Sequence, residues 1–185
     1  MKKLVMILAT SYKNDSAKSR NWFSRFVVPA LRDFGFTDIC SVENHDSALK
    51  FLLDLAGVDT VARQSNGATV AIASRIIQVK PYGSDYDCFS IRDSRRSGRF
   101  TEFEKLQRAI KFNSLRPHFH CQAFVNSEKE MAVVYLTRTK NLIEFVTDNL
   151  IFKNAKDGAK FRLAHIQDLR LAGVDVRSVT VKAKK

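Results

Sequence analysis

The sequence predicts an α/β (or α+β) domain built on a central mixed β-sheet with flanking helices. Helical and strand-like patterns follow one another as strand, helix, helix, hairpin, strand, helix, hairpin and helix, and such an order packs best as helices against a mixed sheet. The chain has 185 residues, of which 45% are hydrophobic, enough for one sizeable core. We therefore expect a single domain over residues 1–185, with a core at about 16–152 and a basic C-terminal extension at about 153–185.

The chain is strongly basic, with a formal net charge of +12 and a pI near 9.8. This charge favours a polyanionic partner, above all nucleic acid, DNA or RNA, and an acidic protein is the other partner that it fits. The three cysteines are odd in number and dispersed, which predicts a reduced, cytoplasmic protein. No apolar run approaches the length of a membrane helix, so we expect no membrane partner.

The first half of the predicted core contains two helices and a short strand. The stretch from Ser16 to Phe34 carries an apolar stripe at helical spacing, and we expect Pro29 to kink or split this helix and Gly35 to end it. Phe36 to Val42 follows as a short strand or connector. Asn44 or Asp46 can cap the second helix, whose apolar residues continue until Gly57. Those apolar residues are Leu49, Leu52, Leu53 and Ala56.

The stretch from Gly57 to Lys80 predicts a β-hairpin, because Asn66-Gly67 lies between two strand-like runs. Two registers are open. A two-residue loop pairs Asp59 with Ser74, whereas a three-residue loop, with Gly67 in the left-handed conformation, pairs Asp59 with Ala73 and places it diagonal to Arg75. The second register brings an acid and a base to one face, and there the Arg would favour the ionised carboxylate.

This hairpin resembles the sheet core of the PD-(D/E)XK, or restriction-endonuclease-like, nucleases. The resemblance rests on an Asp at the head of one strand, a tight turn and a cation on the next strand. The resemblance covers roughly Asn21 to Val146. The counterpart of the family's acid-x-Lys motif is Ala73-Ser74-Arg75, which keeps a cation and lacks the second carboxylate. Gln78-Val79-Lys80, further along the strand, resembles the Gln variant of the motif.

This resemblance implies a restriction-endonuclease-like core and Mg²⁺-dependent phosphodiester hydrolysis. Asp59 would be the metal ligand, with Asp54 or Glu102 supplying a second acid, and Arg75 or Lys80 would supply the cation. Arg75 cannot act as a base because arginine stays protonated, so its role would be electrostatic.

A cluster of arginines follows the next predicted strand, Cys88 to Arg92, in which Phe89 and Ile91 share a face. A glycine among arginines lets backbone N–H groups and guanidinium groups reach a phosphate together. The sequence therefore predicts phosphate contacts from Arg92, Arg95, Arg96, Arg99 and, beyond them, Lys105.

Thr101 begins a helix, with Glu104 three residues later in a capping box. Capping explains both Glu102 and Glu104 without chemistry, and it is the interpretation that the sequence favours. Glu102 and Lys105 nevertheless emerge beside the arginine cluster, where an acid could orient an arginine or hold a metal.

The last third of the chain predicts a second hairpin from Pro117–Val125 and Met131–Arg138, then a helix over Asn141–Ile151. His118 and His120 share a strand face, but further ligands at zinc spacing are missing from the sequence, so we place the pair at a sheet edge or binding surface. A loop, a short helix and a basic strand or tail complete the chain.

Three functions fit these observations. The first is a nucleic-acid-binding protein with a nuclease-like fold, either a hydrolase or a catalytically weakened descendant. The second is a non-catalytic DNA- or RNA-binding protein whose exposed aromatics stack on unpaired bases. The third is a small basic factor of a mobile element that binds an acidic protein. The candidate stacking aromatics are Tyr82, Tyr86, Phe89 and Phe119.

Overall fold

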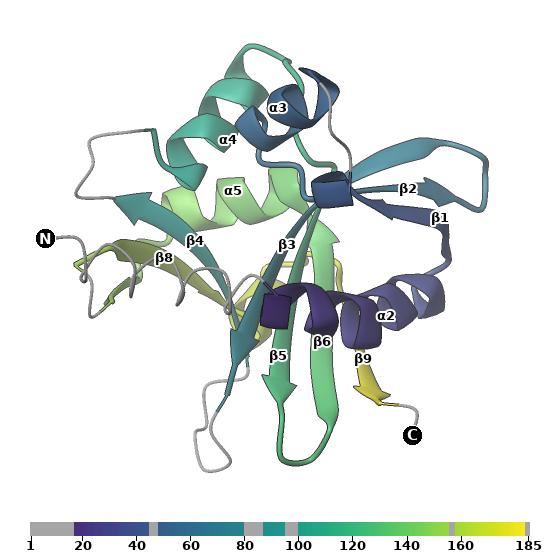
Figure 1. Cartoon of the computed structure of the whole chain (residues 1–185). Coiled ribbons are helices and arrows are strands. Elements are labelled where there is room, and N and C mark those ends of the chain that lie inside the picture. Colours follow the sequence, from purple (N-terminus) through teal and green to yellow (C-terminus); the bar gives the residue numbers. More distant parts are fainter. Residues whose placement is uncertain (1–16, 45–47, 80–86, 95–99, 156–157, 184–185) are drawn as a thin grey trace, which may run out of the picture.

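The computed structural model describes residues 17–44, 48–79, 87–94, 100–155 and 158–183, and they form a mixed α+β fold (Figure 1). The central sheet is curled and mixed, with the strand order β1-β2-β3-β5-β6-β9. Neighbouring strands are antiparallel except β3 and β5, which run parallel and are connected through helix α4. Its strands are β1 (Phe36–Ser41), β2 (Thr60–Gln64), β3 (Thr69–Gln78), β5 (Phe119–Asn126), β6 (Met131–Arg138) and β9 (Val176–Lys182).

A smaller sheet, which the sequence did not predict, packs beside the central one. Its order is β4-β8-β7, formed by β4 (Cys88–Ser94), β8 (Lys160–His165) and β7 (Phe152–Asn154). The chain after residue 152 thus supplies strands to both sheets, because β9 pairs with β6 and β8 pairs with β4. The remaining helices are α3 (Ala48–Leu55), α4 (Glu102–Lys111), α5 (Thr139–Asp148) and α6 (Ile166–Leu171).

Pro29 divides the first helix, as predicted, through a π-helical turn. Residues 17–22 are α-helical, η1 (Phe23–Val27) is a π-helix, and α2 (Val28–Asp33) starts with Pro29 in its first turn. Proline has no N–H to donate to the preceding turn, and the wide turn closes instead through Val28 N–H to the Phe23 carbonyl. Gly35, at φ +89°, ends the helix as expected.

Helices cover both faces of the central sheet (Figure 1). Phe26 and Leu31, from η1 and α2, pack against one face, where they join Ile72 of β3 in the first hydrophobic core. The second core lies between the small sheet and helices α4, α5 and α6, around Phe89 and Leu106. Because β5 lies between these two cores, every one of its residues is buried.

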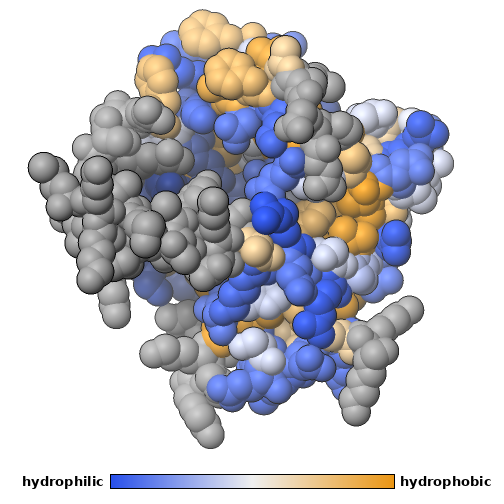
Figure 2. Space-filling view, in the orientation of Figure 1, coloured by the Kyte–Doolittle hydropathy of each residue, from blue (hydrophilic) through white to orange (hydrophobic). Residues whose placement is uncertain are grey.

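The predicted exposure of two aromatic residues and the predicted burial of one leucine are wrong. Phe89 and Phe119 are buried, at 0% and 5% exposure, so neither is available to stack on a base. Helix α3 instead leaves Phe51 and Leu52 exposed, at 65% and 55%, although the spacing of Leu52 suggested a core position. Figure 2 shows such apolar side chains at the top of the molecule, where Figure 1 places α3 and α4.

Among the described residues, none of the helices is both long and apolar enough to cross a membrane.

Candidate functional site

The hairpin adopts the three-residue register, which decides where Asp59 lies. Thr60 pairs with Ile72 and Arg63 with Thr69, and Gly67 has a φ of +82° in the loop. Asp59, just before β2, donates its N–H to the Ile72 carbonyl at 3.1 Å. Its carboxylate Oδ2 accepts the backbone N–H of Ser74 at 2.6 Å. The Asp59 side chain is therefore held against the strand that carries Arg75.

One cavity brings together the predicted site residues that the structure describes. It has a volume of about 330 Å³ and lies between the hairpin, β4 and the start of α4; we call it the Arg75 cavity. The predicted residues that line it are Asp54, Asp59, Arg75, Arg92, Glu102 and Lys105. Three carboxylates and three cations thus face one space, contributed by segments that are up to 51 positions apart in the chain.

Asp59 does not have the acidity that the sequence suggested. Asp59 is exposed and borders two cavities, so water reaches the residue, although neighbouring protein atoms crowd its carboxyl group. This loss of hydration raises the pKa of Asp59 to about 7, the Ser74 N–H opposes the rise, and the negative charges of Glu102, Asp54 and Glu43 add to it. The expectation that Arg75 would keep Asp59 ionised is wrong, because desolvation dominates the pKa of Asp59 and Arg75 is not among the groups that shift it.

Glu102 points into the cavity and takes no part in capping. Glu104 alone forms the capping box with Thr101, accepting the Thr101 N–H at 2.8 Å. Glu102 accepts the backbone N–H of Arg92 at 3.2 Å and lies 3.6 Å from the Arg75 guanidinium. Capping therefore explains only one of the two glutamates, and Glu102 links the arginines of β3 and β4.

Phe161 of β8 is a site residue that the sequence analysis missed. The guanidinium of Arg75 lies 4.5 Å from the centre of its ring, and that of Arg92 lies 5.4 Å from it. Such cation–π contacts are favourable and restrict where a guanidinium can point. Phe161 thus holds both arginines beside the cavity, from a strand whose alternation of polar and apolar residues, Lys160 to Leu163, could have indicated it.

His120 and Gln122 of β5 form the buried side of the site. The expectation that His120 lies at a sheet edge is wrong, because β5 runs between β3 and β6 and His120 is 1% exposed. Its Nε2 lies 3.7 Å from a Glu102 oxygen. Burial lowers the pKa of His120, and the positive charge of Arg75 lowers it further, whereas the negative charge of Glu102 raises it. The net effect is a lowered pKa, so the ring is neutral near pH 7. Gln122 donates to the Arg75 carbonyl at 3.5 Å and accepts from Ser90.

Buried polar atoms without a hydrogen-bond partner in the described structure gather at this cavity. They include the Oγ of Ser74 and the Nε of Arg92, which both line it, and the ring nitrogens of His120 just behind. Buried polar groups are nearly always paired in folded proteins. Ser74 and Arg92 therefore each hold a donor that no described residue satisfies.

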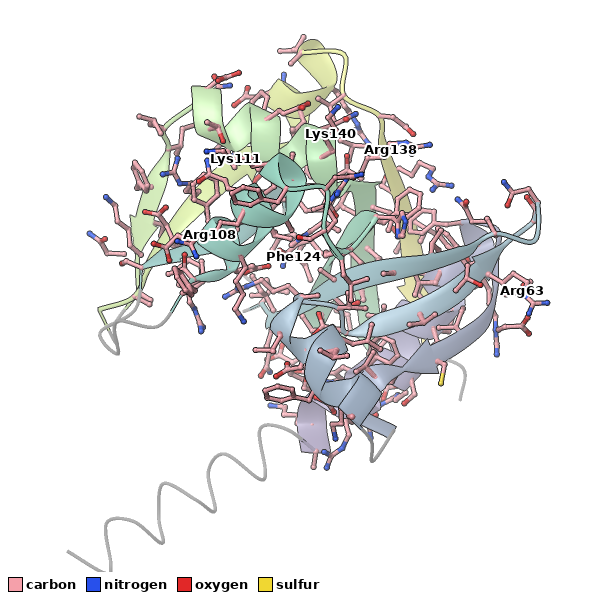
Figure 3. All side chains as sticks on the ribbon, turned by 90° about the horizontal axis from the view of Figure 1, so that it is seen from above. Arg63, Arg108, Lys111, Phe124, Arg138 and Lys140 are labelled. Carbon is pink, nitrogen blue, oxygen red and sulfur yellow. The ribbon has the colours of Figure 1, made fainter. Side chains whose placement is uncertain are left out.

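Six other predicted residues lie outside the described part of the chain: Lys80, Arg95, Arg96, Arg99, Tyr82 and Tyr86. Gln78 is bonded to Lys18 and Ser127 at the far end of β3. Other basic side chains lie on the exposed surface of α4, β6 and α5, and Figure 3 labels four of them: Arg108, Lys111, Arg138 and Lys140.

Within the described residues, no three His, Cys, Asp or Glu side chains are placed to hold a metal ion together. Magnesium needs fewer protein ligands, since it usually binds one or two protein carboxylates and completes its coordination shell with water and substrate phosphates. Asp59 with Glu102 or Asp54, on the wall of one cavity, fits that smaller requirement.

Comparison of the chain with known protein families, with curated proteins and with solved structures yields no match in any of the three.

Proposed function

We propose that this protein binds nucleic acid at the Arg75 cavity and is a Mg²⁺-dependent phosphodiester hydrolase or a catalytically weakened descendant of one. The observation that carries the proposal is the joint lining of one cavity by Asp59 and Glu102 with Arg75, Arg92 and Lys105. Such a set of acids and cations is the one that phosphodiester chemistry requires.

Phosphate binding is supported first by charge. With the pKa of Asp59 near 7, a large share of this carboxyl is protonated at neutral pH, which leaves Asp54 and Glu102 to oppose three cations. Geometry is the second support: Arg92 has an unpaired Nε beside the cavity, and an arginine fork matches two oxygens of a phosphate. Ser74 adds a hydroxyl donor at the same wall.

Asp59, together with Glu102 or Asp54, would hold the metal. When bound, Mg²⁺ would polarise a phosphoryl oxygen and lower the pKa of a bound water. Arg75 would stabilise developing negative charge and cannot act as a base. Glu102 positions Arg75 through the ion pair and β4 through the Arg92 N–H.

The resemblance to the restriction-endonuclease-like nucleases supports this proposal at one point and departs from it at another. The features on which the resemblance rests are Asp59 just before β2, the tight turn and Arg75 on β3. Ala73 stands where that family has its second acid, and it is 4% exposed. In this chain Glu102, from α4, would take the place of that acid.

A second candidate is nucleic-acid binding without cleavage. It is favoured by the apolar side chain of Ala73 and by the proton that Asp59 retains near pH 7. Both leave the cavity better suited to an anion than to a cation.

Incubation of the purified protein with single- and double-stranded DNA and RNA, in Mg²⁺, Mn²⁺ or EDTA, tests the proposal. We expect weak cleavage that needs a divalent ion and rises as the pH passes about 7, because the cation competes with the proton on Asp59. Asp59→Asn should abolish cleavage and leave binding intact, whereas Glu102→Gln should abolish cleavage and also weaken binding, because Glu102 positions Arg75 and the strand of Arg92. Asp38→Asn, at an exposed carboxylate on β1, is the matched control.

Robust cleavage that survives Asp59→Asn would refute this site. Binding with no cleavage under any condition would select the second candidate, and the absence of both would reject a nucleic-acid function.

A further inference from the structure

A second cavity, of about 390 Å³, adjoins the first at the Asp59 carboxylate. Asp59, Ser74 and Ile76 line both, so the two spaces meet along the same short stretch of wall. The other walls come from the first helix, from β1 and from Glu43 of η2 (Val42–Asn44). We call it the Phe23 cavity, and its volume lies within the usual range of about 300–1,000 Å³ for small-ligand sites.

The walls of the Phe23 cavity differ in chemistry from those of the Arg75 cavity. Phe23, Val28, Ile39 and Ile76 give it apolar surface, and serine hydroxyls lie among them. Among its described lining residues the charged groups are Arg20, Glu43 and Asp59, and Arg20 lies 3.9 Å from Glu43. The positive charge of Arg20 is therefore balanced locally, and the cavity is not a second phosphate site.

The π-helical turn gives independent support. Phe23 and Ser24 are the first two residues of η1, and both line the cavity. π-Helical turns are rare and are frequently found at functional sites. Here the widened turn, next to Pro29, is the part of the helix that contributes these side chains to the cavity wall.

We propose that the Phe23 cavity binds the nucleobase of the nucleotide next to the phosphate held in the Arg75 cavity. An aromatic ring and aliphatic side chains suit the flat face of a base, and hydroxyls with Glu43 and Arg20 suit its polar edge. A base held there cannot also be paired, so the substrate is a single strand or a strand with an unpaired nucleotide. This inference rests on the proposed function and names its substrate class.

The test measures binding by fluorescence anisotropy in EDTA, so that no strand is cut. The probes are a short single strand, the same strand with one abasic nucleotide, its duplex and a free nucleoside monophosphate. We expect the wild-type protein to bind the intact strand about tenfold more tightly than the abasic one, from the usual contribution of one stacked base. The duplex should bind more weakly than the intact strand.

Two variants locate the base. Ser41→Trp fills the cavity from β1, and Phe23→Leu removes the aromatic face while keeping apolar volume. Each should remove the preference for the intact strand over the abasic strand. Their matched controls are Thr37→Trp, at an exposed position on β1, and Phe112→Leu, at an aromatic residue 71% exposed after α4. Melting temperatures check that each variant folds.

Equal affinity for intact and abasic strands, or an unchanged preference in both cavity variants, overturns the base site while leaving the proposed function in place. Binding of the free mononucleotide without any binding of strands instead overturns the proposed function and the substrate class, and assigns the cavity to a free nucleotide. Binding of neither overturns both proposals.

Discussion

Replacing Asp59 with Asn should stabilise the protein at alkaline pH and not at acid pH. The folded-state pKa of Asp59 is raised from 3.8 to about 7, so the folded protein holds this proton more tightly than the unfolded chain does. Between about pH 4 and pH 7 the unfolded chain loses the proton first, and the stability of the wild-type protein falls as the pH rises. Above pH 7 Asp59 is ionised in the folded protein too, and the loss of stability is complete. Asn cannot ionise, so the variant does not lose this stability as the pH rises.

The size of the effect follows from the shift and from solvent access. The rise in the pKa of Asp59 from 3.8 to about 7 corresponds to about 4 kcal/mol if it is fully expressed. Water reaches Asp59 from two cavities and screens much of this, so we expect about 1 kcal/mol. For a chain of this length that is about 2–4 °C in melting temperature. The Asn side-chain oxygen can still accept the Ser74 N–H, so this hydrogen bond is kept.

Urea unfolding of the wild type and Asp59→Asn at pH 4.5 and pH 8 measures the effect. The change in free energy of unfolding caused by the substitution should be about 1 kcal/mol more favourable at pH 8 than at pH 4.5. Asp38→Asn, at a carboxylate 65% exposed, should show no such difference. If Asp59→Asn destabilises the protein equally at both pH values, the pKa of the Asp59 carboxyl group is not raised, and the account of its environment is wrong.

Three further substitutions test other parts of the structure. Thr101→Ala should lower the free energy of unfolding by about 1 kcal/mol, the usual value of such a cap, and a change near zero in urea unfolding would contradict the capping box. Phe161→Leu should weaken single-strand binding about fivefold by releasing both site arginines, whereas Phe152→Leu, on the neighbouring strand, should not. Ala73→Glu should raise Mg²⁺ affinity in calorimetric titrations, at some expense of stability, because it adds an acid beside Asp59; a loss of stability alone would count against a nuclease-derived frame.

Local signals in the sequence were enough to predict the parts of the fold that depend on neighbouring residues. Asn66-Gly67 marked the hairpin but left two registers open, and the structure has the one with Gly67 in the left-handed conformation. The capping box at Thr101 placed the start of α4. Once that hairpin and that helix are placed, Asp59, Arg75 and Glu102 come within reach of one another.

Contacts between distant segments could not be predicted in the same way. Strand β8 pairs with β4 about 70 positions earlier, and this pairing cannot be predicted from neighbouring residues. The alternation of Phe161 and Leu163 with Lys160 and Arg162 is a strand signal that the sequence analysis did not use. Capping appeared to explain Glu102 from its place in the first turn of α4, but Glu104 alone forms the capping box. The pKa of Asp59 depends on how many protein atoms surround it, which is a property of the assembled site.

The salt dependence of single-strand binding tests the central claim, that nucleic-acid phosphate is held at the Arg75 cavity, most directly. Each lost phosphate contact lowers the slope of log K against log salt by about 0.7 for a single strand. The account predicts that Arg75→Gln with Arg92→Gln lowers the slope by about 1.4, while Arg63→Gln with Arg138→Gln, at exposed positions outside the cavity, lowers it by less. An unchanged slope in the cavity variant, with a reduced slope in the surface variant, would place the phosphate elsewhere and contradict the account.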